Sequence, residues 1–314
     1  MTKRKIIIIC LTVTLVLLLG IGIYIGVRIW QGNTYTYTVN DTLPEGNGQK
    51  ATVILLGGQS NASGCSLDEY LKKNVSSERY AQYQNGFDNV YINYISGANT
   101  SGGFVKCSTL QGELEGAFGP ELGMAEKLNA LYPDQLFFIV KCAWGGTNLF
   151  EQWLSPTSKG KTGDLYKRFE AFVDANMNYL TSKGYDAEIA GMCWMQGESD
   201  SFSVENATDY KTHLSNFIQD IRKKFAPYGA DGGIAFVDAY IADNPNYWVY
   251  CEYVNQSKLA VANASPLNVV IDTVTMGLSC SAEPEGNPDM AHYDSLSQIQ
   301  LGHAFIEELA KFLD

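Results

Sequence analysis

Residues 51–64, ATVILLGGQSNASG, form the stretch of the sequence that decides the fold. The apolar run at 53–56 is typical of a buried β-strand, and it stops at the glycine pair 57–58. The first hydroxyl group after this pair belongs to Ser60. Open parallel α/β sheets bind ligands at the carboxyl ends of their strands, so Ser60 is a candidate nucleophile for acyl transfer. Small polar residues after a strand more often form a simple turn, so the rest of the chain must supply a base, an acid and an oxyanion hole.

Short apolar runs alternate with amphipathic stretches over residues 51–314. Strands are expected at 51–56, 89–94, 136–141, 189–195, 233–237 and 268–272, and helices at 121–131, 164–183, 206–225, 255–264 and 295–313. Near-continuous apolar strands that alternate with helices are typical of a parallel sheet covered on both faces. The expected fold class is therefore α/β, a three-layer sandwich around a mostly parallel sheet.

The first thirty residues differ from this domain. Lys3, Arg4 and Lys5 precede an apolar run at 6–27, and Arg28 follows it. As a helix this run is about 33 Å long, enough to cross the core of a bilayer. We expect residues 1–30 to be an uncleaved signal anchor, with the amino terminus in the cytoplasm and the catalytic domain outside the cell. The alternative is secretion after signal cleavage, but the run is long for a signal peptide and no convincing cleavage site follows it.

Residues 31–50 are polar and lack apolar periodicity, so they are expected to be a tether to the domain at 51–314. The chain has 22 basic and 34 acidic residues, and residues 1–30 hold four of the basic ones and none of the acidic ones. The remainder thus carries a net charge of −16. Such a charge disfavours nucleic acid and anionic lipid surfaces as partners of the external domain.

Six cysteines follow the apolar run. Two lie in or at the end of strand patterns and are expected to be buried free thiols. The other four occur in turn-rich segments, so pairs such as Cys65–Cys107 or Cys251–Cys280 are open in an oxidising exterior. The sequence does not fix their connectivity. No CxxC or HExxH spacing occurs, so we expect no metal and no cofactor.

The chain has three histidines, and two of them lie inside helical patterns where a structural role is expected. His292 instead follows Asp289 by three residues in NPDMAHYD. In a tight turn or a first helical turn, side chains at this spacing meet. Asp289 could then hold one imidazole nitrogen while the other takes the proton of Ser60. Asp294 is expected to cap the helix that follows.

Two more strand ends carry suitable groups. One leads into CAWGGT with Gly145, and the other into QGESD with Gln196. A serine nucleophile needs donors that point at the developing oxyanion. The expected donors are the N–H groups of Ser60 and Gly145 and the side-chain amide of Gln196. Trp144 near this edge is expected either to stack on a sugar or to pack in the core.

Five blocks of the sequence resemble the sialate O-acetylesterase-like (SASA) branch of the SGNH hydrolases. They are GQSN at 58–61, AFGPELGMAEKL at 117–128, KCAWGGTNL at 141–149, WMQGESD at 194–200 and DMAHYD at 289–294. The resemblance implies a flavodoxin-like SGNH fold and metal-independent removal of O-acetyl groups from sugars of the sialate or xylan type. It also implies Ser60 as nucleophile, Asp289 and His292 as the acid–base pair, and Gly145 and Gln196 at the oxyanion positions.

Glu198 also matches the family motif, and we expect it to support the Gln196 loop or the catalytic histidine. Asn61, Trp144 and Tyr293 are candidates for substrate contact, because they lie near the proposed edge of the sheet. Ala62 departs from the family, which often has methionine there. Two other functions remain open: a GDSL-type lipase or thioesterase with the same triad, and a non-catalytic, membrane-tethered glycan-binding protein on this fold.

Overall fold

The structure is a computed structural model that describes residues 34–313. The predicted membrane anchor and the first residues of the predicted tether lie outside the described range. Within this range, none of the helices combines the length and the hydropathy that crossing a bilayer requires.

Strand β1, Lys50–Gly58, lies at the centre of the sheet. Its neighbours are β7, Leu136–Ala143, and β8, Asp186–Met195, and β1 is parallel to both. The apolar run at 53–56 is fully buried, as expected for a strand covered on both faces. Gly58 pairs with Ala143 and with Met195. The carboxyl ends of the three strands are therefore level, and the segments that follow them start side by side.

The sheet continues on both sides of these three strands. Beyond β8 lie β9, Ala235–Ala239, and β10, Asn268–Ile271, both parallel to β8. Beyond β7 lies parallel β3, Val90–Ser96, and two short antiparallel strands, β4 at Asn99–Thr100 and β5 at Val105–Lys106, pair with β3. Leaving out the outer strand β3, the parallel strands follow the flavodoxin-like order 2-1-3-4-5. The six predicted strands and the mostly parallel sheet are confirmed.

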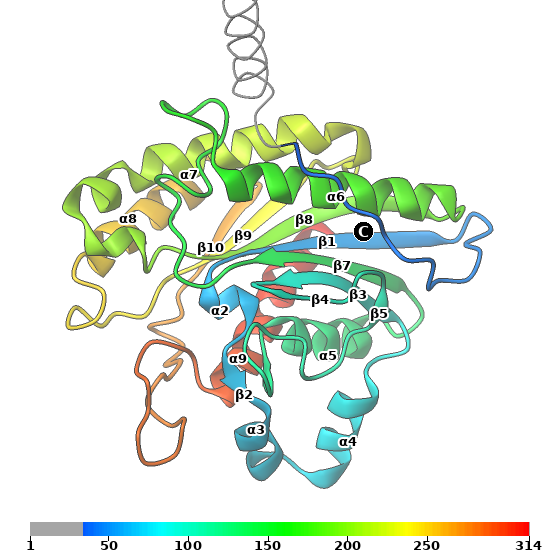
Figure 1. Ribbon diagram of the computed structural model, residues 1–314, viewed down its shortest axis with the longest axis horizontal. Helices are drawn as coiled ribbons and strands as arrows, with labels where there is room; N and C mark the ends of the chain where they lie inside the picture. Colours follow the sequence, from blue (N-terminus) through cyan, green and yellow to red (C-terminus); the bar gives the residue numbers. More distant parts are fainter. Residues whose placement is uncertain (1–33, 314) are drawn as a thin grey trace, which may run out of the picture. The chain divides into compact units, whose positions relative to one another are not determined.

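Helices cover both faces of the sheet (Figure 1). One face carries α6, Asp164–Ser182, α7, Val204–Phe225, and α8, Cys251–Ala262, and the other carries α5, Glu121–Leu131, and α9, Ser295–Leu309. These five helices were predicted to within a few residues at each end. In α7 the buried side chains include Leu214, Phe217 and Ile221, the stripe that a 3.6-residue period places on one face.

Several short elements were not predicted. They are the helices α2, Ser60–Ser63, α3, Asp68–Asn74, and α4, Ser77–Asn85, the strand pair β2, Ser66–Leu67, and β6, Ala117–Phe118, and the 3₁₀ turns Asp200–Phe202, Ala226–Tyr228 and Ala310–Phe312. Each is too short to show a clear hydrophobic period. The β2–β6 pair joins the segment after Ser60 to the segment before α5.

Residues 37–49, which belong to the expected tether, pack along the domain. The Tyr37 ring lies 5.3 Å from that of Phe172, measured between centroids. The backbone N–H groups of Thr42 and Leu43 donate to the Tyr179 hydroxyl. The described part of the expected tether is thus mostly held by α6.

All six cysteines in the described range are free thiols. The two expected in strands are buried there, in agreement with the prediction. The disulfides considered for the other four are absent from residues 34–313. Cys107 is buried, and its Sγ lies 3.4 Å from the Glu121 carbonyl oxygen.

Candidate active site

The turn after β1 presents Ser60 at the start of α2. Gly58 has φ of 138°, and a Cβ atom at this position would lie 1.9 Å from the Met195 carbonyl oxygen. Glycine therefore allows the chain to pass close to β8, where the Gln59 N–H donates to that same oxygen. Neither the N–H nor the hydroxyl of Ser60 has a hydrogen-bond partner among the described residues. Ser60 is largely buried, with 9% of its surface exposed.

Asp289 and His292 form a tight turn just before α9. The Asp289 Oδ1 accepts the backbone N–H groups of Ala291 and His292, and Oδ2 lies 2.7 Å from the imidazole Nδ1. Burial alone would raise the pKa of Asp289, but these hydrogen bonds outweigh it and the pKa is lowered. The other imidazole nitrogen, Nε2, has no protein partner in the part of the chain that the structure describes. The pair is therefore arranged as a base held by a carboxylate.

Asn61 connects the nucleophile segment to the histidine segment. Its Oδ1 accepts the Tyr293 N–H at 3.0 Å, and its Nδ2 lies 3.4 Å from the Ala291 carbonyl oxygen. The residue after Ser60 thus bonds both neighbours of His292 in the sequence. The side chain of Asn61 is buried and holds the two segments together, and a substrate contact by Asn61 stays a prediction.

Tyr293, another candidate for substrate contact, lies in the core. Its ring is buried and its hydroxyl donates to the Tyr240 carbonyl oxygen at 3.3 Å, so it offers no face to a sugar. Asp294 does not cap α9 through its side chain. Its carboxylate instead accepts the N–H groups of residues 281–283 and fixes the loop that precedes the Asp289 turn.

The Glu198 side chain contacts the side chain of Asn61. Its Oε1 accepts the Asn61 amide at 2.8 Å, whereas its buried Oε2 has no partner within residues 34–313. Burial raises the pKa of Glu198 despite that hydrogen bond and the opposing influence of nearby Lys258. Glu198 therefore holds Asn61 in place, and its supporting role in catalysis stays a prediction.

Gln196 is buried, and its amide group faces the protein. Its Nε2 donates to Asp200 Oδ2 at 2.6 Å and to the Thr147 carbonyl oxygen at 3.0 Å, and Tyr210 donates to its Oε1. Burial raises the pKa of Asp200 to about 6, although three donors oppose the shift. In this arrangement the Gln196 amide would have to exchange a protein acceptor for a substrate oxygen in order to act as an oxyanion donor.

Glu113 is a residue of the site that sequence reasoning missed. Its Oε2 accepts the Gly145 N–H at 2.8 Å and the Ser63 hydroxyl. The proposed oxyanion donor of Gly145 is thus already bonded to a carboxylate. Glu113 comes from the loop between β5 and β6, and no local pattern in the sequence singles out this glutamate.

Trp144 is partly buried and packs against the fully buried Trp153, with ring centroids 6.4 Å apart. The structure therefore places Trp153 in the core and leaves part of Trp144 accessible next to Gly145. A sugar contact by Trp144 stays a prediction.

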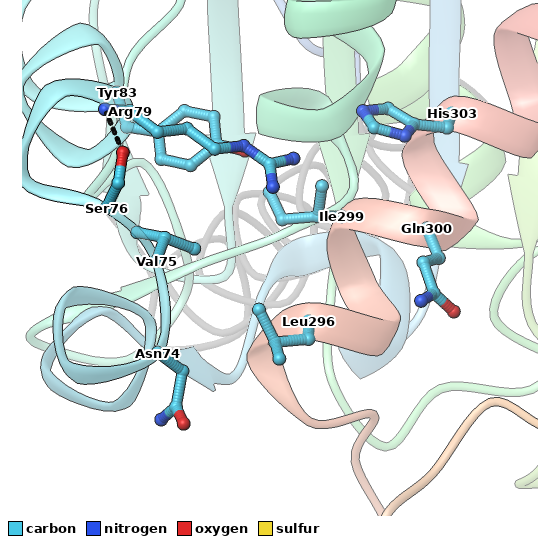
Figure 2. A pocket seen from close by; sticks show the side chains of 9 residues that line it. All are labelled: Asn74, Val75, Ser76, Arg79, Tyr83, Leu296, Ile299, Gln300 and His303. Carbon is cyan, nitrogen blue, oxygen red and sulfur yellow. Dashed lines mark hydrogen bonds between the residues drawn. The ribbon is translucent and has the colours of Figure 1, made fainter.

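A hollow of about 580 Å³ lies between α4 and α9, and none of the predicted site residues lines it. Figure 2 shows Arg79 and Tyr83 on one side of it and His303 on the other. All three donate to Glu126, and these hydrogen bonds lower the pKa of Glu126 to about 2 against the effect of burial. His303 thus has the structural role expected for it, and the charges around this hollow are already paired.

Comparison with solved structures places the fold among carbohydrate esterases and related proteins. A protein from Arabidopsis thaliana matches with a TM-score of 0.58 and 18% identity, over 83% of this chain and 98% of that one. NanS matches with a TM-score of 0.59 and 15% identity, over 85% and 98% of the two chains. A carbohydrate acetylesterase from Xanthomonas citri matches at 0.53 and 16% identity, over 82% of this chain and 56% of that one.

No curated protein matches the chain. The model of one family matches residues 50–311, which is most of the sequence and the whole of the described sheet. The five sequence blocks, the level strand ends and the Asp289–His292 turn all fall within this match. The chain belongs to the family described as carbohydrate esterase, sialic acid-specific acetylesterase, and is a carboxylic ester hydrolase.

Proposed function

We propose that the chain is a serine esterase that removes O-acetyl groups from carbohydrates through an acetyl-serine intermediate. The observation that carries this proposal is the link through Asn61, which ties the Asp289–His292 pair to the segment of Ser60. Family membership supports the substrate class. The test is acetate release from a panel of acetylated glycans, compared with hydrolysis of acetyl and octanoyl p-nitrophenyl esters. Octanoyl preference would favour a lipase or thioesterase instead.

In the proposed mechanism the Ser60 Oγ attacks the acetyl carbonyl carbon while His292 Nε2 takes its proton. Asp289 stabilises the imidazolium ion through Nδ1. As the tetrahedral intermediate breaks down, His292 gives the proton to the departing sugar oxygen, and the acetyl group stays on Ser60. His292 then takes a proton from water, the resulting hydroxide attacks the acetyl-serine, and acetate leaves as Ser60 regains its proton.

The oxyanion formed in both steps needs hydrogen-bond donors. The Ser60 N–H can donate to the oxyanion without losing another hydrogen bond, because it has no acceptor among residues 34–313. The Gly145 N–H becomes available when the Glu113 carboxylate moves away. We keep Gln196 as a third proposed donor, which would give up one of its present acceptors.

Replacing Glu113 with alanine is expected to raise kcat/KM for p-nitrophenyl acetate by about tenfold. The carboxylate competes for the Gly145 N–H, and a charge-assisted hydrogen bond of this kind contributes about 1.5–3 kcal/mol. Its negative charge would also repel an oxyanion at the same donor. Glu115→Ala is the matched control, since Glu115 is an exposed acid of the same loop. A lower kcat/KM for the Glu113→Ala variant alone would show that the carboxylate assists catalysis.

We also propose that residues 1–30 anchor the chain in a membrane with the catalytic domain outside the cell. The support is the apolar run at 6–27 with its preceding basic residues. The full chain should stay in the membrane fraction after an alkaline carbonate wash, and external protease should degrade the domain in intact cells. Recovery of a shortened chain in the culture medium would instead favour signal cleavage.

A further inference from the structure

Five aromatic residues form a cluster on the surface, which we call the aromatic patch. They are Phe202, Tyr247, Trp248, Tyr250 and Tyr253. Phe202 is 60% exposed, Tyr253 is 51% exposed and Tyr247 is 42% exposed, whereas Trp248 is largely buried beneath them. The ring centroids of Phe202 and Trp248 lie 5.4 Å apart, and those of Tyr247 and Trp248 lie 6.2 Å apart. Large aromatic rings exposed together on a surface usually mark a binding site.

The aromatic patch lies at the same edge of the sheet as the proposed active site. Phe202 ends the segment that follows β8, and Tyr247 and Trp248 lie in the segment that follows β9, so both leave the same edge of the sheet as Ser60 (Figure 1). The Tyr250 N–H donates to the Ser201 carbonyl oxygen. The Ser201 hydroxyl in turn donates to the Glu198 carbonyl oxygen. These two hydrogen bonds tie the segment that carries Tyr250 to the segment of Glu198, and a substrate that extends from Ser60 along this edge of the sheet would approach the patch.

The charges of this region exclude anionic ligands. The segments 199–206 and 240–256, which carry the patch, contain no Lys or Arg, and Glu205, Asp243 and Glu252 are exposed on them. The segments that follow β1, β9 and β10, at 59–65, 240–250 and 272–294, also contain no Lys or Arg. A carboxylated sugar, a phospholipid or a nucleic acid would meet repulsion from the exposed carboxylates here, and the nearby Lys258 is buried and paired with Asp238.

A neutral sugar chain fits these observations. A pyranose ring has apolar C–H faces that pack on aromatic rings, and its hydroxyl groups can bond the phenol groups at the rim. Acidic side chains accept hydrogen bonds from sugar hydroxyls without requiring an opposite charge. We propose that the aromatic patch binds a neutral glycan chain beyond the acetylated sugar at Ser60. This inference rests on the proposed esterase function and narrows its substrate to neutral acetylated oligosaccharides or polysaccharides rather than sialic acids.

The first test measures binding without chemistry. The Ser60→Ala chain is titrated calorimetrically with xylohexaose, a neutral probe, and with sialyllactose, an anionic one. Xylohexaose should bind more tightly, and adding Phe202→Ala and Tyr247→Ala should raise its Kd by about tenfold, equivalent to about 1.4 kcal/mol. Leu131→Ala, which removes an exposed apolar side chain from the end of α5, should leave the Kd unchanged. The proposal would be overturned if the Ser60→Ala chain bound xylohexaose equally well with and without the two aromatic substitutions. It would also be overturned if sialyllactose bound more tightly than xylohexaose.

The second test separates this inference from the proposed function. With Ser60 intact, the Phe202→Ala/Tyr247→Ala variant should lose about tenfold more kcat/KM on acetylated xylo-oligosaccharides than on p-nitrophenyl acetate, mainly through KM. If the unaltered chain hydrolyses no acetate ester, the esterase proposal fails. The calorimetric titration still shows whether the aromatic patch binds a neutral glycan. Sedimentation velocity of the unaltered chain and of the Phe202→Ala/Tyr247→Ala variant then measures their oligomeric states. Self-association that these substitutions abolish would assign the patch to a second copy of the chain and overturn glycan binding.

Discussion

Replacement of Ser60 by alanine is expected to lower the rate of p-nitrophenyl acetate hydrolysis by roughly 10⁴ to 10⁶-fold, the range for loss of a catalytic serine. The reason is that the substitution removes the atom that would carry the acetyl group, and His292 then has no hydroxyl proton to accept. Stability should change little, within about 0.5 kcal/mol, because the Ser60 hydroxyl has no protein hydrogen bond in the described range. The measurements are initial rates and thermal unfolding of the purified full chain.

Two controls make this result specific. Ser77→Ala alters an exposed serine at the start of α4 and should keep full activity. A serine-reactive phosphonate should add its mass to the peptide containing Ser60 in the unaltered chain and leave the Ser60→Ala chain unlabelled. An alanine variant that keeps most of the activity would reject Ser60 as the nucleophile, and a chain that the phosphonate does not label would favour a non-catalytic glycan-binding protein.

The layers of the fold follow from sequence because the hydrophobic pattern acts over whole elements. The buried run at 53–56 and the stripe on α7 each repeat one signal several times, and both were predicted. The short helix α2 has four residues, all buried, and shows no such repetition. Its position depends on the close passage of Gly58 past β8, which is a tertiary contact. For this reason the strands and long helices could be predicted, and the small elements around the site could not.

The candidate site was predictable where its geometry is local. Asp289 and His292 meet within one turn, so their spacing in the sequence was sufficient to predict the contact. The bond between Glu113 and Gly145 joins residues from two long loops, and only the fold brings them together. Tyr293 is next to His292 in the sequence but lies in the core, because neighbouring residues of a turn can point in opposite directions.

Replacement of Lys141 by methionine is expected to destabilise the domain by about 3–5 kcal/mol, the usual cost of leaving a buried charge without its partner. Lys141, on β7, is fully buried, and its Nζ donates to Glu121 Oε2 at 2.7 Å and to the Gln111 carbonyl oxygen at 3.2 Å. The remaining Oε1 of Glu121 accepts the Gly119 N–H. Methionine fills similar volume but cannot neutralise Glu121. Chemical denaturation of each chain measures the difference in unfolding free energy.

The matched control is Lys106→Met, which breaks the exposed Lys106–Asp88 ion pair and should cost at most about 1 kcal/mol. The double variant Lys141→Met/Glu121→Gln should recover part of the loss, because it removes both buried charges. Recovery would identify the uncompensated carboxylate as the cause, whereas an equal loss in the double variant would assign it to packing or to the Gln111 contact. Gln111 lies two residues before Glu113, so loss of the Gln111 contact would loosen the loop that carries Glu113. The Gly145 N–H would then be released from Glu113, and kcat/KM should change together with stability.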